Sequence, residues 1–547
     1  MSRLVPTSAN VRGFPPTATA LPLAAPGSPT SDQPEPLTSA PLDVQMALRG
    51  EPLRILFIAA EGTPYVKTGG MADVIGALPR ALSRMGHDVR VALPRYKAVD
   101  IARWGLHLAQ SQLAAPMSRR SELVDVYEVV HDDGVRVYFI DAPEYFNRER
   151  LSNYPDDGDR FILFSRAVME FIRKGDWAPD VIHCHDWHTG IVPNWMKTIY
   201  RGDPLLGQAA SVYTIHNLAY QGIFGYRILE VAGIAEEGFL YTEGADQSAM
   251  VDLMGRGIVF SDVVSTVSPR YAAEILSDGY GERLDPLLRS RKDRLYGILN
   301  GIDTEQFNPA TDISITSHFD AFSLDQRPAN KTALQRQFAL PVEERTPLVA
   351  IISRLNDQKG YDLLDLTLLP LLEQGVQLVV QGTGDLHYHQ MLQKLAVRYP
   401  RQVAFQFTFS NELSQRIYAG ADLLLMPSHV EPCGSTQMLA MRYGCIPVVH
   451  RTGGLADAVQ EFDPETNSGN GFSFTAYDPF QFFAAVMRAL EVYRFRDVWR
   501  DLMQRAMLAD NSWEAAAEQY VALYRRAQEL QRVSVARAGA AGSDLAG

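Results

Sequence analysis

Ser428-His429-Val430-Glu431-Pro432-Cys433-Gly434-Ser435-Thr436-Gln437 connects a short apolar run to a helical pattern. The apolar run, residues 421–427, is nearly continuous, as is typical of a strand that is buried on both faces of a parallel sheet. The helical pattern begins near Thr436. The stretch therefore predicts the strand, loop and helix of an open α/β sheet, and ligands bind such sheets at the carboxyl ends of their strands.

A carboxylate, Glu431, lies in this loop just before the predicted helix. Free backbone N–H groups and the positive end of the helix dipole at that point suit a diphosphate. The combination predicts a ligand in which a sugar is attached to a diphosphate. An ordinary strand-to-helix turn with a capping Ser or Thr is the alternative, and position alone favours that turn. The stretches described below favour the ligand site instead.

Apolar runs and helical patterns alternate along most of the chain, which predicts parallel sheets covered by helices on both faces. The predicted strands are 53–60, 89–94, 135–140, 180–182, 210–215, 348–353, 377–381, 403–407, 421–427 and 446–449, with helices such as 74–84 and 160–173 between them. The Asn300-Gly301 turn separates two such series. We therefore expect two α/β domains, residues 51–299 and 300–511.

Composition narrows the class of protein. Hydrophobic residues make up 46% and charged residues 21% of the 547 residues, as in ordinary globular proteins. The net charge is −13 and no long basic run is present, so we expect no nucleic-acid partner. Cys184, Cys433 and Cys445 are too scattered for a disulfide framework or a zinc site, which suits a reducing compartment. No apolar run reaches the roughly 18 residues of a membrane span, and we expect a cytoplasmic protein.

Residues 1–50 differ from the rest of the chain. They are rich in Pro, Ala, Ser and Thr and contain no acidic residue before Asp32, so we expect a disordered extension. Arg3 and Arg12 among Ser and Thr residues leave a plastid transit peptide as the alternative, whereas the apolar core of a secretory signal is missing.

The first strand leads into Lys67-Thr68-Gly69-Gly70. Paired glycines allow a loop to approach a ligand closely at a helix N-terminus, and Lys67 adds a charge that meets phosphate. The loop lacks both the Walker spacing and the dinucleotide fingerprint, so neither ATP hydrolysis nor NAD binding is inferred.

Two further strand ends carry histidines and polar groups. One is His183-Cys184-His185-Asp186-Trp187-His188 and the other is His216-Asn217. A metal site is the less favoured interpretation, because a strand end does not easily turn three of these histidines onto one ion. We favour a polar crevice for sugar hydroxyls, with Trp187 and Tyr220 able to stack on sugar rings, and we expect His183 to be a hydrogen-bonded core residue.

In the second half, strand ends deliver Arg354 and Lys359, then Gly382 and Gly384, then Phe409, and finally the glycines of residues 451–457. All of these positions lie at the carboxyl edge of the predicted sheet. Arg354 and Lys359 could neutralise a diphosphate leaving group, because fixed cations stabilise developing negative charge.

Six motifs together resemble the bacterial glycogen synthases and plant starch synthases, glycosyltransferase family 5. They are Lys67-Thr68-Gly69-Gly70, His185-Asp186-Trp187-His188, Thr214-Ile215-His216-Asn217, Ser353-Arg354-Leu355 with Gln358-Lys359-Gly360, Glu431-Pro432-Cys433-Gly434 and Arg451-Thr452-Gly453-Gly454-Leu455. The resemblance runs in order from about residue 53 to 525. It implies a GT-B fold, in which two Rossmann-like, doubly wound domains face each other across a cleft. A helix over residues 512–530 would cross back to the first domain, and residues 531–547 would form a flexible tail.

The resemblance implies transfer of glucose from ADP-glucose to the non-reducing end of an α-1,4-glucan, with retention of configuration and without metal or cofactor. The first domain would bind the acceptor and the second the nucleotide sugar. Arg354 and Lys359 would hold the diphosphate, and Lys67, Gly69 and Gly70 would close over it. Asp186 and His216 would contact the glucosyl group, and Glu431 would orient the sugar and stabilise the oxocarbenium-like transition state. The other expected binding residues are Asn217, Gly382, Gly384, Phe409, Cys433, Gly434, Thr436 and Gln437.

Several positions depart from the family pattern. Gly255-Arg256-Gly257 replaces Lys-Gly-Gly, Phe307 replaces Trp, and Phe409 replaces the Tyr expected to stack on adenine. Val430, Ser435 and Leu439 also differ. We interpret these changes as shifts in donor, acceptor or chain-length preference, because the catalytic set is complete.

Three alternatives stay open on the sequence. One is a transferase that uses UDP-glucose or another acceptor, and a second is a silent glucan-binding relative, which should lack a member of the catalytic set. The third is a glycan phosphorylase, for which no motif of a lysine-bound pyridoxal phosphate is found.

Overall fold

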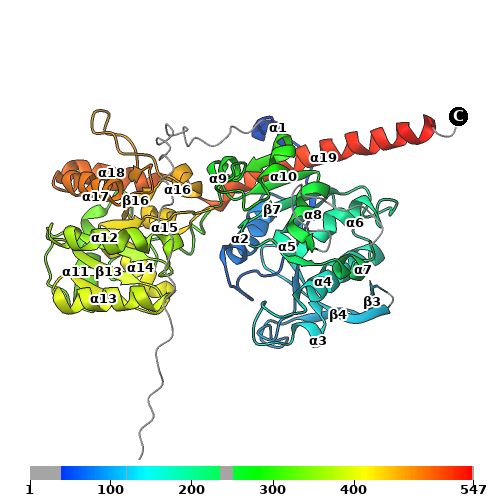
Figure 1. The fold of residues 1–547 in the computed structure, drawn as a ribbon, viewed down its shortest axis with the longest axis horizontal. Coiled ribbons are helices and arrows are strands. Elements are labelled where there is room, and N and C mark those ends of the chain that lie inside the picture. The colour runs from blue at the N-terminus through cyan, green and yellow to red at the C-terminus, as the bar shows by residue number, and fades with distance from the viewer. Residues whose placement is uncertain (1–38, 119, 235–249, 545–547) are drawn as a thin grey trace, which may run out of the picture. The chain divides into compact units, whose positions relative to one another are not determined.

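Two sheets, one in each half of the chain, organise the computed structural model (Figure 1). The structure describes residues 39–118, 120–234 and 250–544, with side chains up to residue 536. The described residues form one compact unit. No helix in the described ranges combines the length and the apolar character that crossing a membrane requires.

The first sheet is parallel except at one edge. Its strands lie in the order β11 (Leu295–Gly297), β10 (Val263–Thr266), β7 (Ala210–Ile215), β6 (Val181–His185), β1 (Arg54–Ile58), β2 (Asp88–Pro94), β5 (Arg136–Asp141), β4 (Arg120–Val130) and β3 (His107–Met117). The central strands are buried on both faces, which explains their continuous apolar runs.

β3 and β4 form an antiparallel hairpin that we did not predict from the sequence. Most side chains of β3 are exposed, and its pairing with β4 shifts register between Leu108 and Leu113. An exposed strand with irregular register lacks the alternation of apolar and polar residues that identifies strands in a sequence.

The second sheet is wholly parallel. Its order is β14 (Val403–Gln406), β13 (Gln377–Gln381), β12 (Leu348–Ile352), β15 (Leu423–Met426), β16 (Ile446–His450) and β17 (Phe472–Phe474). A separate pair is formed by β8 (Ile223–Gly225) and β9 (Met250–Asp252).

Helices cover both sheets (Figure 1). In the first half they are α2 (Gly70–Arg84), α3 (Pro143–Phe146), α4 (Asp157–Lys174), α5 (Asp186–Thr189), α6 (Ile191–Lys197), α7 (Arg227–Val231), α8 (Leu253–Phe260), α9 (Pro269–Glu274) and α10 (Asp285–Ser290). In the second half they are α11 (Pro328–Gln337), α12 (Tyr361–Leu372), α13 (Leu386–Arg398), α14 (Asn411–Gly420), α15 (Thr436–Arg442), α16 (Gly453–Ala458), α17 (Pro479–Tyr493) and α18 (Arg496–Leu508). Short 3₁₀ turns lie at Lys292–Arg294, Leu324–Gln326 and Asp357–Lys359.

Both sheets reverse their strand order at one point. In the first sheet the reversal lies between β1 and β6, and in the second it lies between β12 and β15; both pairs are parallel neighbours. Open α/β sheets bind ligands at such switch points, just beyond the carboxyl ends of the two strands. The loops after these four strands carry Lys67, Asp186, Arg354 and Glu431.

The last helix, α19 (Trp513–Asp544), joins the second half of the chain to the core of the first. Trp513, Tyr520 and Tyr524 belong to the first-half core, and α19 packs against α2 and β7. The helix continues beyond residue 530, where we predicted a flexible tail, because its sequence contains no proline and remains rich in helix-forming residues. Residues 545–547 lie outside the described part of the chain.

The chain crosses between its two halves twice, once near Ile302 and once near Asn511. These two crossing segments are hydrogen-bonded to each other. The Ile302 N–H donates to the Asn511 carbonyl at 2.8 Å. A Cβ at Gly301 would lie 2.5 Å from the backbone nitrogen of Trp513, so only glycine allows this approach.

The predicted disordered extension, residues 1–50, falls mostly outside the described residues. Its end contradicts the prediction, because residues Val44–Ala47 form α1, which packs against α19. Asp43 caps this helix by accepting the Met46 N–H at 2.9 Å, and Ala47 is buried. Composition alone did not indicate this short capped turn.

Candidate active site

Glu431 lies in the loop after β15 and is 7% exposed. Its Oε2 accepts a hydrogen bond from the Ser428 hydroxyl at 3.0 Å and forms an ion pair with Lys359. The carboxylate is therefore fixed by a cation and a hydroxyl that come from the ends of neighbouring strands. A buried carboxylate with such partners is held in one orientation.

Lys359 is positioned by a short turn after β12. Its backbone N–H donates to the side chain of Asn356 at 3.1 Å, and Gly360 follows with a φ of 81°. A Cβ at Gly360 would lie 2.1 Å from the Pro427 carbonyl oxygen. Glycine here lets the lysine turn lie directly against the end of β15.

The segments that contain Gly434 and Gly453-Gly454 pack against each other. Gly453 has a φ of 43°, and a Cβ there would lie 2.0 Å from the Glu431 carbonyl oxygen. The Gly454 N–H donates to that same oxygen at 3.2 Å. Gly434 has a φ of 69°, and Gln437 donates to its carbonyl oxygen at 2.6 Å. The Glu431 loop is therefore held on its backbone as well as through its carboxylate.

Arg354, just beyond β12, has an exposed side chain. Among the described residues, no hydrogen bond or ion pair involves its guanidinium. Gly382 and Gly384 lie beside it, and each has a packing reason: Cβ atoms there would lie 1.9 Å from the Ser353 carbonyl oxygen and 2.3 Å from the Leu355 carbonyl oxygen. These glycines let the loop after β13 support the arginine loop.

The aromatic ring of Phe409 is free for stacking, since Phe409 is 52% exposed. It follows β14, the edge strand, and lies beyond the stacked pair of Phe407 and His389, whose ring centroids are 4.1 Å apart. Thr436 and Gln437 open α15, and Cys433 is partly buried between the two cores.

Asp186 follows β6 with a φ of 53°, an uncommon conformation for a residue other than glycine. Its Oδ1 accepts the backbone N–H of His216 at 2.8 Å. Burial raises the pKa of Asp186 to about 7, and the nearby charge of Glu61 contributes in the same direction. The bond to His216 joins the ends of β6 and β7, so these two predicted site residues are brought together.

The histidines of this region are neutral. Burial lowers the pKa of His216 to about 3, and its Nε2 lies 3.0 Å from Nδ1 of His185. His183 is fully buried between Tyr524 and Thr214, at 3.0 and 2.6 Å, which confirms the prediction of a core residue. In the described part of the chain, no group of three or more His, Cys, Asp and Glu residues could hold a metal ion.

The side chains of Trp187 and Asn217 make contacts within the protein. The prediction that Trp187 stacks on sugars is wrong, because it is 9% exposed and its ring stacks on His188 at 4.0 Å. A Cβ at Gly222 would lie 2.5 Å from the Trp187 ring, so the chain closes over it. The Asn217 side chain accepts the Ala219 N–H at 3.0 Å, and Tyr220 is 61% exposed.

Lys67 precedes α2, which begins at Gly70. No side chain caps this helix, because its N-cap residue is Gly69. Its ammonium pairs with Asp73 at 2.7 Å, and both side chains are about half exposed. The neighbouring N–H groups of Thr68 and Gly69 donate to the carboxylate of Glu61, which sequence analysis did not single out.

Contacts between the two halves converge on the Glu431 loop. The Ser268 hydroxyl donates to the Pro432 carbonyl at 2.7 Å, and the Glu274 carboxylate accepts the Gly453 N–H at 3.0 Å. Val430 and Cys433 pack against the first-half core. Among the described residues, no hydrogen bond or ion pair joins the predicted site residues of the first half to those of the second.

Ser428, Ser268 and Glu274 were missed by sequence reasoning. Each acts through a partner that is distant in sequence or through the local geometry of a loop. Their one signal was position, since each lies in or beside a segment that follows a strand end.

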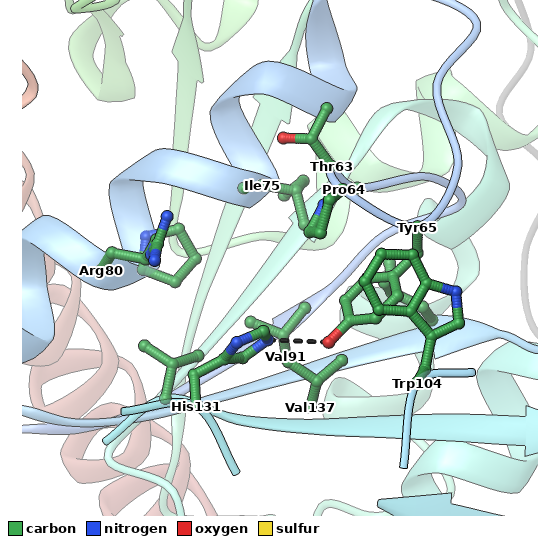
Figure 2. A pocket seen from close by; sticks show the side chains of 14 residues that line it. Thr63, Pro64, Tyr65, Ile75, Arg80, Val91, Trp104, His131 and Val137 are labelled. Carbon is green, nitrogen blue, oxygen red and sulfur yellow. Dashed lines mark hydrogen bonds between the residues drawn. The ribbon is translucent and has the colours of Figure 1, made fainter. Parts of the chain in front are cut away.

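A separate cavity of about 260 Å³ is lined in part by Thr63, Pro64 and Tyr65 (Figure 2). It is enclosed by α2, β2, β5 and the turn that precedes Lys67, and mostly apolar side chains line it. Two of its polar groups are paired: the Tyr65 hydroxyl lies 2.7 Å from His131 Nε2, and Arg80 pairs with Asp133 at 2.5 Å. Trp104 Nε1 is buried and has no hydrogen-bond partner among the described residues. None of the predicted site residues lines this cavity.

Sequence profiles of two families match the chain. The starch synthase catalytic domain matches residues 54–290, and glycosyl transferases group 1 matches residues 334–505. The starch synthase IV catalytic domain of Arabidopsis thaliana, solved with ADP and acarbose, has a TM-score of 0.80 and 34% identity, covering 88% of this chain and all of that one. The sucrose-phosphate synthase of Thermosynechococcus elongatus, at 18% identity, 86% and 98% coverage and a TM-score of 0.53, shares the fold alone. The predicted GT-B fold is confirmed.

Curated relatives match over nearly their whole length. The glycogen synthase of Desulforamulus reducens is 43% identical over 87% of this chain and 98% of its own. That of Thermotoga maritima is 42% identical over 87% of this chain and 99% of its own. The chain belongs to the glycogen synthase and starch synthase family of glycosyltransferases.

Proposed function

We propose that this protein elongates an α-1,4-glucan by transferring glucose from ADP-glucose with retention of configuration. The observation that carries the proposal is the fixed Lys359–Glu431 pair at the switch point of the second sheet, in a chain of the glycogen synthase family. The related starch synthase IV was solved with ADP, which favours an adenine nucleotide here.

Arg354 and Lys359 bind the diphosphate in this proposal. Arg354 is exposed and its charge is unmatched within the described residues, whereas Lys359 already faces a carboxylate. The bond between the anomeric carbon and the diphosphate oxygen breaks with its electron pair on that oxygen, and the two cations stabilise the charge that develops. Lys67 and the N–H group of Gly70, at the start of α2, add positive potential from the first half, while the Gly69 N–H donates to Glu61.

The glucosyl group becomes positively charged as the bond breaks. Glu431 supplies a fixed negative charge and hydrogen-bond acceptors for this group, and Asp186 supplies a second carboxylate when it is ionised. His216 stays neutral and contacts the sugar as a hydrogen-bonding group, as does the adjacent Asn217. The acceptor 4-hydroxyl attacks from the face that the diphosphate leaves, and its proton passes to the departing phosphate oxygen.

The remaining binding residues have supporting roles. Phe409 stacks on the adenine, while Gly382 and Gly384 hold the loop beneath it. The part of the binding site next to Glu431 is formed by Cys433, Gly434, Thr436 and Gln437. We place the reaction in the cytoplasm, with the nucleotide sugar and the glucan as the partners.

A transfer assay tests this function. Purified protein is incubated with glycogen and either labelled ADP-glucose or labelled UDP-glucose, and label in the polymer is counted. We expect a higher kcat/KM with ADP-glucose and α-1,4 linkages in the product. Preferential use of UDP-glucose would change the donor assignment, and absence of label with both donors would refute the transferase.

A further inference from the structure

Glu61 lies just beyond β1 and is 5% exposed. One of its oxygens, Oε2, accepts three hydrogen bonds: from the Thr68 N–H, from the Thr68 hydroxyl at 2.6 Å and from the Gly69 N–H at 3.3 Å. These donors directly precede α2. A buried carboxylate that accepts only from the adjacent loop determines the conformation of that loop.

The chain between Glu61 and Thr68 forms a tight turn. Gly62 and Val66 bridge each other, and Thr63 donates its N–H to the Ala72 carbonyl of α2 at 2.9 Å. A Cβ at Gly76 would lie 1.9 Å from the Thr63 hydroxyl oxygen, so the turn lies directly on the helix. Figure 2 shows Thr63, Pro64 and Tyr65 above the cavity, with the Tyr65 hydroxyl directed to His131.

The turn therefore has support on both sides. On the cavity side, Tyr65 packs edge-on against Trp104 and Phe139, with ring centroids 4.7 and 4.8 Å away. On the other side, the Glu61 carboxylate accepts a hydrogen bond from the Thr68 hydroxyl at the end of the same turn. Lys67 lies between these two anchors, so its backbone position depends on both.

Glu61 also lies beside the second predicted group of the first half. β1 and β6 are parallel neighbours, and Ile58 pairs with Cys184, so Glu61 and Asp186 emerge at the same edge three and two residues later. The effect of the Glu61 charge on Asp186 agrees with this proximity. Glu61 therefore lies at the first switch point, between the glycine loop and the carboxylate expected to face the sugar.

We propose that Glu61 is a positioning residue that holds Lys67-Thr68-Gly69-Gly70 in the conformation that receives the diphosphate of the donor. It acts through the backbone of this loop and does not touch the reacting atoms. A carboxylate suits the role because all three partners donate and an ionised carboxylate only accepts. The inference rests on the proposed function, since it takes the diphosphate as the ligand of the loop.

The test compares Glu61→Ala, Glu61→Gln and Lys67→Ala in the full chain. ADP affinity is measured by calorimetry, and kcat and KM for ADP-glucose by polymer labelling. We expect Glu61→Ala to weaken ADP binding about 10-fold and to lower kcat about 100-fold, since small misplacements of binding groups have effects of that size. Glu61→Gln keeps an oxygen acceptor in place and should recover much of the ADP affinity.

A double-mutant cycle separates positioning from general stabilisation. If Glu61 acts through the loop that carries Lys67, Glu61→Ala combined with Lys67→Ala should bind ADP no more weakly than the more affected single variant. Glu461→Ala is the matched control, because Glu461 also accepts a backbone N–H and a hydroxyl, from Ser473 at 2.6 and 2.7 Å. It should leave ADP affinity unchanged.

Each outcome decides the inference. Wild-type ADP affinity in folded Glu61→Ala overturns it, as does simple addition of the two losses in the double variant. If Glu61→Ala does not fold, the cycle is run with Glu61→Gln, whose smaller remaining loss of ADP affinity must be coupled to Lys67; no loss, or a loss that simply adds to that of Lys67→Ala, overturns the inference. A wild-type protein that neither binds ADP nor labels glycogen refutes the proposed function instead.

Discussion

Lys359 and Glu431 form an ion pair across the switch point of the second sheet, with 24% and 10% of their side-chain surfaces exposed. The ammonium group comes from the turn after β12 and the carboxylate from the loop after β15. The pair is thus built from two neighbouring parallel strands. In the proposed function, Lys359 faces the negative charge that develops on the diphosphate in the transition state. Glu431 faces the positive charge that develops on the sugar.

The first prediction concerns Lys359. Lys359→Ala removes the cation proposed to bind the diphosphate and leaves Glu431 without its ionic partner. We expect kcat/KM for ADP-glucose to fall about 100- to 1,000-fold, as when one group that stabilises developing charge is removed. Lys359→Arg, which keeps the charge, should retain more activity. Lys394→Ala, at an exposed lysine of α13, is the control and should behave as wild type. An unchanged rate in Lys359→Ala would exclude the phosphate role.

Glu431 should affect the chemical step more than nucleotide binding. Glu431→Ala is expected to reduce kcat by about 100-fold or more while ADP affinity changes little, because in the proposed function its interaction is strongest in the transition state. Rapid-quench turnover and ADP calorimetry on the same preparation separate the two effects. Near-normal kcat in this variant would refute the assignment.

The third prediction uses the pH dependence of Asp186. Its pKa is raised from 3.8 to about 7 by burial, so the folded protein binds this proton more tightly than the unfolded chain does. Ionisation of Asp186 therefore lowers the free energy of unfolding as pH rises from about 4 to about 7. Asp186→Asn keeps the acceptor for the His216 N–H and cannot ionise.

The melting temperature of Asp186→Asn, compared with that of the wild type, should accordingly differ little at pH 4.5 and be higher at pH 8. Its kcat should be low at both pH values, because the second carboxylate is lost. Equal pH dependence of stability in the two proteins would contradict the raised pKa.

Much of this site could be predicted because its elements follow a simple rule. Buried parallel strands appear as apolar runs, and ligand groups follow their carboxyl ends, so Lys67, Asp186, Arg354 and Glu431 could be selected from the sequence. The same rule failed for the β3–β4 hairpin, whose exposed side chains leave no apolar run.

Other features depended on packing that a linear pattern does not contain. Trp187 is covered by the close approach of Gly222, and Glu61 bonds to a loop that returns to it after a tight turn. Gly382 and Gly384 were predicted as ligand positions, yet their contacts with the backbone of Ser353 and Leu355 already require glycine. Spacing identified these positions without revealing their partners.

The fourth prediction follows from those contacts. In Gly382→Ala the new Cβ would lie 1.9 Å from the Ser353 carbonyl oxygen, so the backbone must shift. We expect a loss of about 1–3 kcal/mol in the free energy of unfolding, as for other overpacked sites, together with weaker ADP binding because Arg354 follows Ser353. Gly202→Ala is the control, since a Cβ there meets nothing within 4 Å. Wild-type stability in Gly382→Ala would show that the loop can move freely.

The last prediction concerns the exposed ring of Phe409. If it stacks on adenine, Phe409→Ala should weaken ADP binding about 10-fold, since stacking of a base on an aromatic ring contributes about 1–3 kcal/mol. Phe409→Tyr keeps the π-face and should bind ADP as well as wild type. Because Phe409 is 52% exposed, neither change should alter the melting temperature. The affinity of UDP provides the internal comparison: an adenine-specific role predicts a larger loss for ADP than for UDP in Phe409→Ala, whereas equal affinities of wild type and Phe409→Ala for ADP would place the base elsewhere.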